Sequence, residues 1–388
     1  MPETLETLLQ SSLYTDEHRL FRQTFRQFVE REVVPRIPAW EAAGLAPRAL
    51  WKRMGEQGYL CPWVDPEYGG AGADFLYSAI IDEELARVGA NIAVALHSDV
   101  VAPYIASYGT PEQKARWLPR CVSGDLLLAI AMTEPDAGSD LQAIRTAARR
   151  DGDHYVLNGR KIFITNGISA DLVIVVARTD PEARPAHRGL SLIAVEAGTP
   201  GFTKVRNLHK LGAHGQDTAE LLFEDCRVPV ANRIGEENRG FQYLMEKLQQ
   251  ERLVMAILSQ AMAERMLEDA VRYAKARVAF GQPVASFQHS QFKIAEMATE
   301  LALGRAFLDA LIAAHMRGED VVTRVSMAKW WIGEMANRVA YHCLQLHGGY
   351  GYMEEYPIAR FYRDVRFHTI AGGTTEIMKT IIARRLGL

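Results

Sequence analysis

The spacing of apolar residues changes twice along the 388-residue chain, and this change constrains the fold more than any other feature. Residues 1–125 carry apolar side chains at helical spacing, and residues 236–388 do so again. Between them, over 126–235, apolar and polar residues alternate as they do in strands, with glycine and proline at the breaks. We therefore predict an α+β, mostly α fold with three domains: an N-terminal helical domain (1–125), a middle β domain (126–235) and a C-terminal helical domain (236–388).

Start and stop signals place individual elements within these regions. Thr15 followed by two acidic residues is a typical helix start, and Thr110-Pro111 is another, with proline at the first helical position. Further helices are expected over 78–90, 93–108, 240–277, 286–316, 321–346 and 375–385. Strands are expected over 171–178, 190–196 and 219–223.

Composition excludes several classes of function. Lysine and arginine number 44 and aspartate and glutamate 47, so the net charge of −3 gives no electrostatic reason to expect a nucleic-acid partner. Four scattered cysteines without a C-x-x-C pair argue against a disulfide framework or a zinc site, and we expect no metal. No apolar run reaches about 18 residues, so no membrane span is expected. Without a visible leader, the expected compartment is the cytoplasm, with the mitochondrial matrix as the alternative.

The segment from Ile130 to Gly167 has the strongest local signal for a ligand. It reads I-A-M-T-E-P-D-A-G-S-D and, after a polar spacer, L-N-G-R-K-I-F-I-T-N-G. The first part places a hydroxyl beside a turn that aims backbone N–H groups one way. The second part is an alternating strand, with Asn158-Gly159 expected as a tight turn before it. Donors beside an apolar face suit a flat ring with polar edges such as a flavin, although an ordinary hairpin has the same pattern.

A second signal is a carboxylate on an apolar helix face. Glu251 occupies one position of a stripe at spacings of three and four that otherwise contains Leu244, Leu248, Met255, Leu258 and Met262. A charge there is unfavourable unless it is paired, solvated in a cleft or protonated. A catalytic carboxylate fits this position. The alternative is an irregular stripe with Glu251 paired at its edge to Arg252 or Lys247.

The sequences of these segments closely resemble the acyl-CoA dehydrogenase family, and the resemblance extends over essentially the whole chain. T-E-P-x-A-G-S-D followed by K-x-F-I-T-N-G resembles the flavin-binding middle domain of that family. The resemblance implies a barrel-like or sandwich β domain, a C-terminal four-helix bundle, FAD as cofactor and a homo-oligomer of two or four subunits. It implies oxidation of a saturated acyl-CoA to a trans-2-enoyl-CoA, with electrons passed to an electron-transfer flavoprotein.

The resemblance also bears on the catalytic base. Most members carry a glutamate just before the last helix, where this chain has Gly372. Long-chain and isovaleryl types instead place the base on the helix that begins the C-terminal domain, and Glu251 matches that position. The loss at one position together with the gain at the other predicts Glu251 as base. The main-chain N–H of Gly372 would still hydrogen-bond the thioester carbonyl. Glu376 lies four residues beyond and is not predicted to be the base.

The remaining site residues are carried over from the resemblance. Cofactor contacts are implied for Ile130, Met132, Thr133, Gly138, Ser139, Phe163, Thr165, Arg277, Phe280, Gln288, Gln345, Gly348, Gly349, Thr374 and Glu376. Substrate contacts are implied for Ser139, Leu248, Arg252, Gly373 and Arg384. Arg277, in an R-x-x-F-G-x segment, would reach the flavin pyrophosphate of a neighbouring subunit, because a guanidinium binds phosphate through two hydrogen bonds. From its position alone, it could equally be a solvated arginine at a helix end.

Three shorter segments resemble the long-chain type, namely 96–101, 348–353 and 372–379. We therefore expect a medium- to long-chain substrate, with a short or branched, isovaleryl-like substrate as the alternative. Two rivals remain: an acyl-CoA oxidase, and a non-catalytic protein that binds flavin or acyl-CoA. The second is motivated by the missing glutamate at Gly372.

Overall fold

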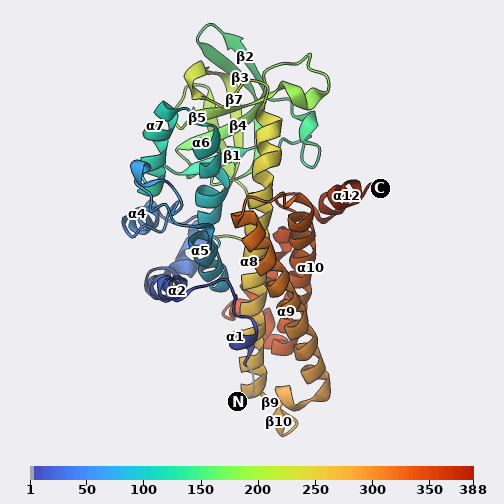
Figure 1. Ribbon diagram of the computed structural model, residues 1–388. Helices are drawn as coiled ribbons and strands as arrows, with labels where there is room; N and C mark the ends of the chain where they lie inside the picture. Colours follow the sequence, from blue (N-terminus) through green and yellow to red (C-terminus); the bar gives the residue numbers. More distant parts are fainter. Residues whose placement is uncertain (1–3) are drawn as a thin grey trace.

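The computed structural model describes residues 4–388 and has the three parts expected from the spacing of apolar residues. Figure 1 shows the sheet at the top, the N-terminal helices on one side below it, and the C-terminal helices extending to the bottom. One long helix, α8 (Gly240–Ala276), runs from the sheet down through the helical bundle. The predicted α+β, mostly α fold is confirmed.

The N-terminal part consists of short helices that begin at polar caps. Its α-helices are α1 (Leu5–Leu8), α2 (Asp16–Phe28), α3 (Ile37–Ala43), α4 (Arg48–Glu56), α5 (Phe75–Arg87), α6 (Ala102–Tyr108) and α7 (Pro111–Val122). Both expected starts are confirmed: Thr15 accepts a hydrogen bond from the His18 N–H, and Thr110 from the Gln113 N–H. A π-helical segment, Leu96–Val101, leads into α6, so the helix expected over 93–108 is real but irregular.

The middle part is one eight-stranded sheet. Its strands are β1 (Leu128–Ala131), β2 (Ala147–Asp151), β3 (His154–Thr165), β4 (Leu172–Arg178), β5 (Leu190–Glu196), β6 (Phe202–Asn207), β7 (Thr218–Pro229) and β8 (Arg233–Ile234). The order is β6-β7-β3-β2-β4-β5-β8, with β1 parallel to β4. The three expected strands are β4, β5 and part of β7.

Strand β4 is buried on both faces. Ile174 packs into the core that the sheet shares with the N-terminal helices, whereas Val173 and Val175 pack into a second core formed by the strands and the turns between them. A strand buried on both faces has a continuous apolar run, and 172–177 has one. The sheet therefore has an interior of its own and an outer face covered by helices.

The prediction of a turn at Asn158-Gly159 is wrong. Both residues lie inside β3, which pairs with β2 on one side and β7 on the other. The register against β7 shifts at this point, and a Cβ on Gly159 would lie 2.5 Å from the Thr146 hydroxyl. The glycine therefore permits a bulge and a close approach rather than a turn. The chain reverses at Gly152, where φ is 62°.

The C-terminal part is a bundle built around α8. It contains α9 (Gln288–Met316), α10 (Val322–His347), α11 (Pro357–Asp364) and α12 (Thr375–Arg385), and a small hairpin of β9 (Val278–Ala279) and β10 (Gln282–Pro283). The helices expected over 240–277, 286–316, 321–346 and 375–385 are confirmed to within two residues. The helix α11 was not expected, because proline and glycine surround its short apolar stretch.

Packing fixes α8 at its start and along its middle. At its start, a Cβ on Gly240 would lie 2.9 Å from the Leu190 carbonyl oxygen, so only glycine lets the helix begin this close to β5. Further along, Ile257 is buried in a core shared by α5, α8, α9 and α10. Side chains on α8 therefore hold fixed positions relative to both the sheet and the bundle.

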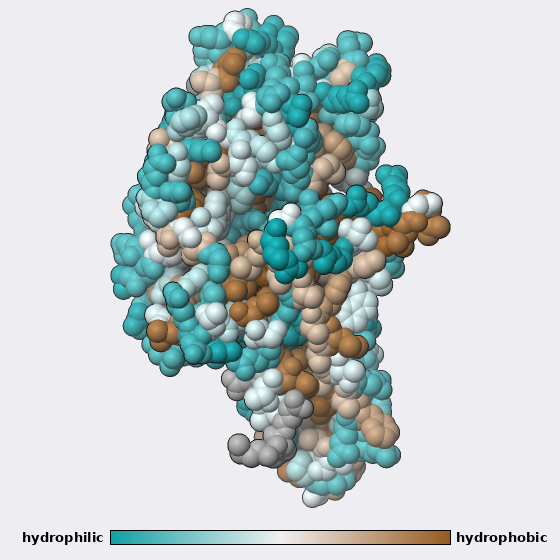
Figure 2. Space-filling model, viewed as in Figure 1, coloured by the Kyte–Doolittle hydropathy of each residue, from teal (hydrophilic) through white to brown (hydrophobic). Residues whose placement is uncertain are grey.

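The surface is mostly polar, as Figure 2 shows for one face, with apolar residues at the outer end of α12. Leu386 and Leu388 lie there and are exposed. Among residues 4–388, none of the helices is long and apolar enough to cross a membrane.

Candidate active site

Glu251 is a buried carboxylate with one hydrogen-bonding partner. It lies on α8 with 8% of its surface exposed, and the Tyr104 hydroxyl on α6 donates to its Oε1 at 2.7 Å. Burial raises the pKa of Glu251 to about 7, although the Tyr104 hydrogen bond and the nearby Arg252 charge oppose this rise. The carboxylate is therefore near its titration midpoint at neutral pH, as a general base should be.

The alternative position for Glu251, at the edge of its stripe and paired with a neighbouring cation, is wrong. Lys247 donates to the Ser107 hydroxyl at 2.6 Å instead. Arg252 influences the pKa of Glu251 through its charge, but its Nε donates to the Gly372 carbonyl at 3.4 Å. No ion pair of Glu251 occurs in the part of the chain that the structure describes.

The loop before α12 lies against the same stretch of α8. A Cβ on Gly372 would point at the Met255 side chain at 3.5 Å, and Met255 is one helical turn beyond Glu251. Gly372 and Gly373 have φ values of 67° and 101°, which favour glycine. Lys329 on α10 donates to the Gly373 carbonyl. The structure thus brings Glu251, Arg252 and both glycines together.

Two further titratable groups lie under this loop. Burial and the neighbouring Arg252 lower the pKa of Lys329 to about 8. Burial, with Lys329 nearby, lowers the pKa of His368 to about 3, so this histidine is neutral. The Nδ1 of His368 lies 2.7 Å from the Ser259 hydroxyl, which itself donates to the Met255 carbonyl, so Nδ1 carries the proton. The loop therefore lies over a polar, positively charged floor.

The sheet segment singled out in the sequence is held by a buried lysine. Lys161 Nζ donates to the Met132 carbonyl and to Glu134 Oε1, each at 2.9 Å. The Thr133 carbonyl accepts from the Ile162 N–H at 3.0 Å. These bonds fix the Thr133 segment against β3. The pairing of Lys161 with Glu134 was not predicted from the sequence, although a lysine at a buried strand position indicates that it needs a partner.

Strand β3 turns one aromatic ring outward beside this segment. The register against β7 shifts between Lys161 and Ile164, and Phe163 has φ 61° there. Its side chain is 65% exposed, whereas Ile164 is buried in the sheet interior. An exposed ring in a rigid strand offers a flat apolar surface to a ligand. Ile130 is buried in β1, Thr165 is half-buried, and Gly138 and Ser139 are exposed.

A second group of predicted cofactor contacts lines a pocket of about 460 Å³ at the far end of α8. Arg277, Gln345, Gly348 and Gly349 are among its lining residues. The Arg277 guanidinium carbon lies 5.6 Å from the centroid of the Tyr350 ring, and no ion pair of Arg277 occurs among residues 4–388. An unpaired guanidinium between glycines suits a phosphate.

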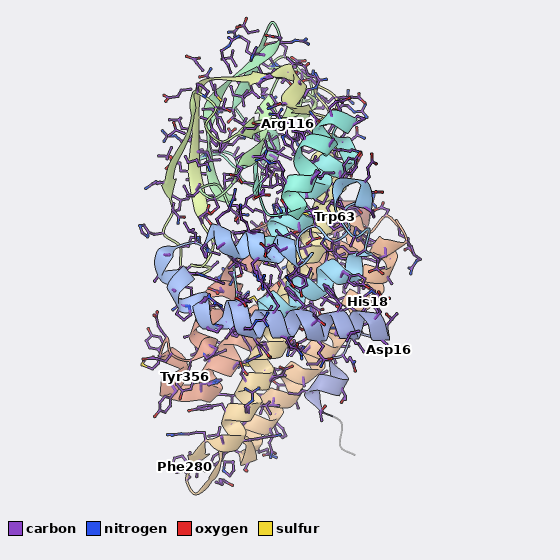
Figure 3. All side chains as sticks on the ribbon, turned by 90° about the vertical axis from the view of Figure 1, so that its left-hand side faces the viewer. Asp16, His18, Trp63, Arg116, Phe280 and Tyr356 are labelled. Carbon is purple, nitrogen blue, oxygen red and sulfur yellow. The ribbon has the colours of Figure 1, made fainter. Side chains whose placement is uncertain are left out.

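The two groups of predicted cofactor contacts do not meet within one chain. Arg277 directly follows α8, at the end far from the sheet that carries Phe163, and it is 26 residues from Glu251, which corresponds to about 39 Å at 1.5 Å per residue. Phe280, 97% exposed, lies at the tip of the hairpin at the bottom of Figure 3. Gln288 is exposed just after the hairpin. A single chain therefore presents two partial sites.

The remaining predicted residues lie on or near α12 and α8. Thr374 caps α12 by accepting from the Ile377 N–H at 3.3 Å. Glu376 is exposed in the first turn, and hydrogen bonds from its own backbone N–H and from the Thr374 side chain lower its pKa. A solvated carboxylate with a lowered pKa is a poor base, which argues against Glu376. Leu248 is buried on α8, and Arg384 is exposed on α12.

Three polar residues of this site were missed in the sequence: Tyr104, Lys329 and His368. Each is a buried polar side chain in a helical segment that otherwise looks like ordinary core. Tyr104 lies 147 residues before its partner Glu251, so helix periodicity alone could not pair them. Lys329 was the easiest to find, because a lysine on the apolar face of a predicted helix calls for an explanation.

Three family models match the chain. They are described as the N-terminal, middle and C-terminal domains of acyl-CoA dehydrogenase, and they cover residues 15–125, 129–226 and 238–387. The chain is 49% identical to the long-chain specific acyl-CoA dehydrogenase of Sus scrofa over 96% of this chain and 87% of that protein.

Solved structures give the same result. The crystal structure of an acyl-CoA dehydrogenase from Geobacillus kaustophilus matches with a TM-score of 0.97 and 59% identity, over 98% of this chain and all of the other. A glutaryl-CoA dehydrogenase from Mycobacterium smegmatis, solved in complex with FADH2, matches with a TM-score of 0.90 and 30% identity over 96% of this chain and 95% of the other.

Proposed function

Since the chain belongs to the acyl-CoA dehydrogenase family, whose members are flavoprotein oxidoreductases, we propose that it uses FAD to oxidise a saturated, medium- to long-chain fatty acyl-CoA to the trans-2-enoyl-CoA. One observation carries the proposal: Glu251, with a pKa of about 7, is buried on the stretch of α8 whose Arg252 and Met255 lie against the glycine loop. The likeness to a long-chain enzyme supports the chain length.

Glu251 is the proposed base. The proton on the carbon next to a thioester is a weak acid, so its removal needs a carboxylate that is a stronger base than one in water. Burial provides this strength by raising the pKa of Glu251. The α C–H bond breaks, its proton moves to a Glu251 oxygen, and the bonding pair remains on the substrate as the new double bond forms.

The glycine loop has the complementary role. As the α-proton leaves, negative charge develops on the thioester oxygen, and the main-chain N–H of Gly372 is the proposed donor to that oxygen. Arg252 and Lys329 hold this loop through its carbonyl groups and bring positive charge next to it. Arg252, Leu248 and Gly373 are the proposed inner substrate contacts, with Ser139 and Arg384 further out.

The residues of this chain fit a flavin. The exposed ring of Phe163 beside the Thr133 segment suits the flat ring system, and unpaired Arg277 among glycines suits the pyrophosphate. A flavin held by these residues would supply the acceptor for the hydride that leaves the β-carbon of the substrate. The solved relative that holds FADH2 supports FAD as the cofactor.

The separation of these two groups supports an oligomer. If each cofactor is held by Phe163 of one subunit and Arg277 of another, then at least a dimer is needed, and we propose a dimer of dimers. The proposed electron acceptor is an electron-transfer flavoprotein. Four buried cysteines without a disulfide suit a reducing compartment, for which we propose the cytoplasm.

Anaerobic titration of the purified FAD enzyme with saturated acyl-CoA thioesters tests the proposal. We expect the flavin absorbance to bleach, fastest with medium- or long-chain substrates, and the product to be the trans-2-enoyl-CoA. A spectral shift without bleaching at every chain length would instead show a non-catalytic binding protein. Fastest reduction by isovaleryl-CoA would reassign the substrate, and rapid reoxidation of the reduced enzyme by oxygen would indicate an oxidase.

A further inference from the structure

The N-terminal helices contribute one side chain to the catalytic carboxylate. Tyr104 lies on α6, is fully buried, and donates to Glu251 Oε1 at 2.7 Å. Neither side chain has another hydrogen bond among the residues that the structure describes. One carboxylate oxygen is thus fixed, and the other is left without a protein partner.

Two contacts about one helical turn away help to fix the position of Tyr104. One helical turn further along α6, the Tyr108 hydroxyl donates to Glu246 on α8 at 2.5 Å. Lys247 on α8 donates to Ser107 on α6 at 2.6 Å. These contacts tie α6 to α8 independently of the catalytic pair, so the phenol oxygen cannot drift away from the carboxylate.

We propose that Tyr104 is a positioning residue for the reaction: its hydroxyl binds one oxygen of Glu251 so that the other oxygen faces the α-proton of the acyl-CoA. This inference rests on the proposed function, because it assumes that Glu251 is the base. A carboxylate on a flexible glutamate side chain has several rotamers, and a hydrogen bond to one oxygen selects one of them.

The hydroxyl also favours the reactive form of the base. It donates to the ionised carboxylate and so opposes the effect of burial on the pKa of Glu251. Burial and the Glu251 charge raise the pKa of Tyr104 well above its usual value, so the phenol remains a donor at every working pH. The other charged group facing Glu251 is Arg252, on its own helix, and Lys329 on α10 faces that arginine.

The test is a pH profile of flavin reduction in the FAD enzyme. Tyr104→Phe removes the hydroxyl and keeps the ring that fills the space. We expect the acid limb to move up by about 0.7 pH units, which corresponds to the loss of about one hydrogen bond. We also expect the plateau rate to fall about tenfold, because the carboxylate loses its orientation. Rates are measured by anaerobic stopped flow with one saturated acyl-CoA over about pH 5.5 to 9.5.

Tyr108→Phe is the matched control. It removes a phenol hydroxyl from the same helix and breaks a bond to the same partner helix, but away from the base. The Lys247–Ser107 hydrogen bond still ties α6 to α8 in this variant, so we expect its pH profile to coincide with that of the unmodified enzyme. If Tyr104→Phe also leaves the acid limb in place and only lowers the melting temperature, Tyr104 is structural and the inference is overturned.

A double variant separates this inference from the proposed function. Because Tyr104 works through Glu251, Tyr104→Phe should cause no further loss once Glu251→Gln is present. An additional tenfold loss in the double variant would show that Tyr104 contacts the substrate directly, and would overturn the positioning role. Near-normal reduction by Glu251→Gln alone would instead reject Glu251 as base, whatever Tyr104 does.

Discussion

Two buried tyrosine–glutamate pairs among residues 4–388 differ in their chemistry. Tyr104 donates to Glu251 at 2.7 Å where α6 meets α8, and Tyr14 donates to Glu83 at 3.1 Å where the N-terminal segment meets α5. Both carboxylates are buried, and both pairs join segments far apart in the sequence. The pKa of Glu251 is raised to about 7, whereas that of Glu83 is lowered.

Arginines account for this difference. Burial acts to raise the pKa of Glu83 as well, but Arg305 lies 2.7 Å and Arg22 3.0 Å from its oxygens, and their charges outweigh burial. Glu251 has no such partner, since the nearby Arg252 bonds to the glycine loop. A buried carboxylate with two arginines is a fixed anion that ties helices together, whereas one with a tyrosine alone keeps a raised pKa, as the proposed base requires.

Replacement of the two carboxylates by glutamine should separate the two roles, with the largest effect on catalysis. Glu251→Gln keeps the shape and removes the basicity, so we expect flavin reduction by a saturated acyl-CoA to slow by on the order of 10³-fold, about 4 kcal/mol in barrier. Substrate should still bind. Anaerobic stopped flow measures the rate, and Glu83→Gln is the control, with a rate near that of the unmodified enzyme.

The second prediction concerns the free energy of unfolding, for which we expect Glu83 to be the important carboxylate of the two. Glu83→Gln leaves Arg305 and Arg22 beside a neutral amide, with buried positive charge that only the neighbouring carboxylates offset. We expect the free energy of unfolding to fall by about 3 kcal/mol, measured by urea unfolding of the FAD enzyme at pH 7.5. A loss as small as that of an exposed ion pair, below about 1 kcal/mol, would contradict the structural role.

The two sites also differ in how far the sequence predicts them. The apolar stripe predicts that Glu251 lies on a buried helix face, because 3.6-residue periodicity is a local pattern that does not depend on distant parts of the chain. The partners Tyr104, Arg22 and Arg305 could not be predicted, because they lie 147, 61 and 222 residues from their glutamates and only tertiary packing brings them close.

The same limit explains the misplaced turn at Asn158-Gly159. That pair is a strong local turn signal, but pairing with β2 and β7 overrides it and leaves Gly159 as a bulge. The three-part fold, the long helix and the strands β4 and β5 were predictable, because each has a sustained pattern. The two groups of proposed cofactor contacts follow only from family motifs, because exposed residues such as Phe163 and Arg277 have no periodic signature.

The third prediction uses the pH dependence of stability to test whether the pKa of Glu251, unlike that of Glu83, is raised. The pKa of Glu251 rises from an ordinary 4.5 to about 7 on folding. Between these values the folded protein keeps a proton that the unfolded chain has lost, so Glu251 lowers stability progressively from pH 4.5 to 7, and the full penalty is present above pH 7. Glutamine cannot ionise. We therefore expect Glu251→Gln to be about 3 kcal/mol more stable than the unmodified enzyme at pH 8.

This gain should vanish at pH 4.5, where the glutamate is protonated in the folded protein. Unfolding in urea at both pH values, with equal FAD occupancy, measures the difference. A gain that is the same at both pH values would show that the amide simply packs better, and would argue against a raised pKa for Glu251.

The smallest expected effect comes from the tyrosine of the structural pair. Tyr14→Phe removes one hydrogen bond from Glu83, but Arg305 and Arg22 still hold both carboxylate oxygens. The folded-state pKa of Glu83 should therefore stay low, and the loss of stability should be only about 1 kcal/mol, the usual net value of one hydrogen bond. The pH profile of flavin reduction should not move, in contrast to the shift expected for Tyr104→Phe. A shift of that profile in Tyr14→Phe would mean that the two pairs are coupled through α8, since Arg305 also bonds Glu264 on that helix, and that the ion-pair network tunes the base.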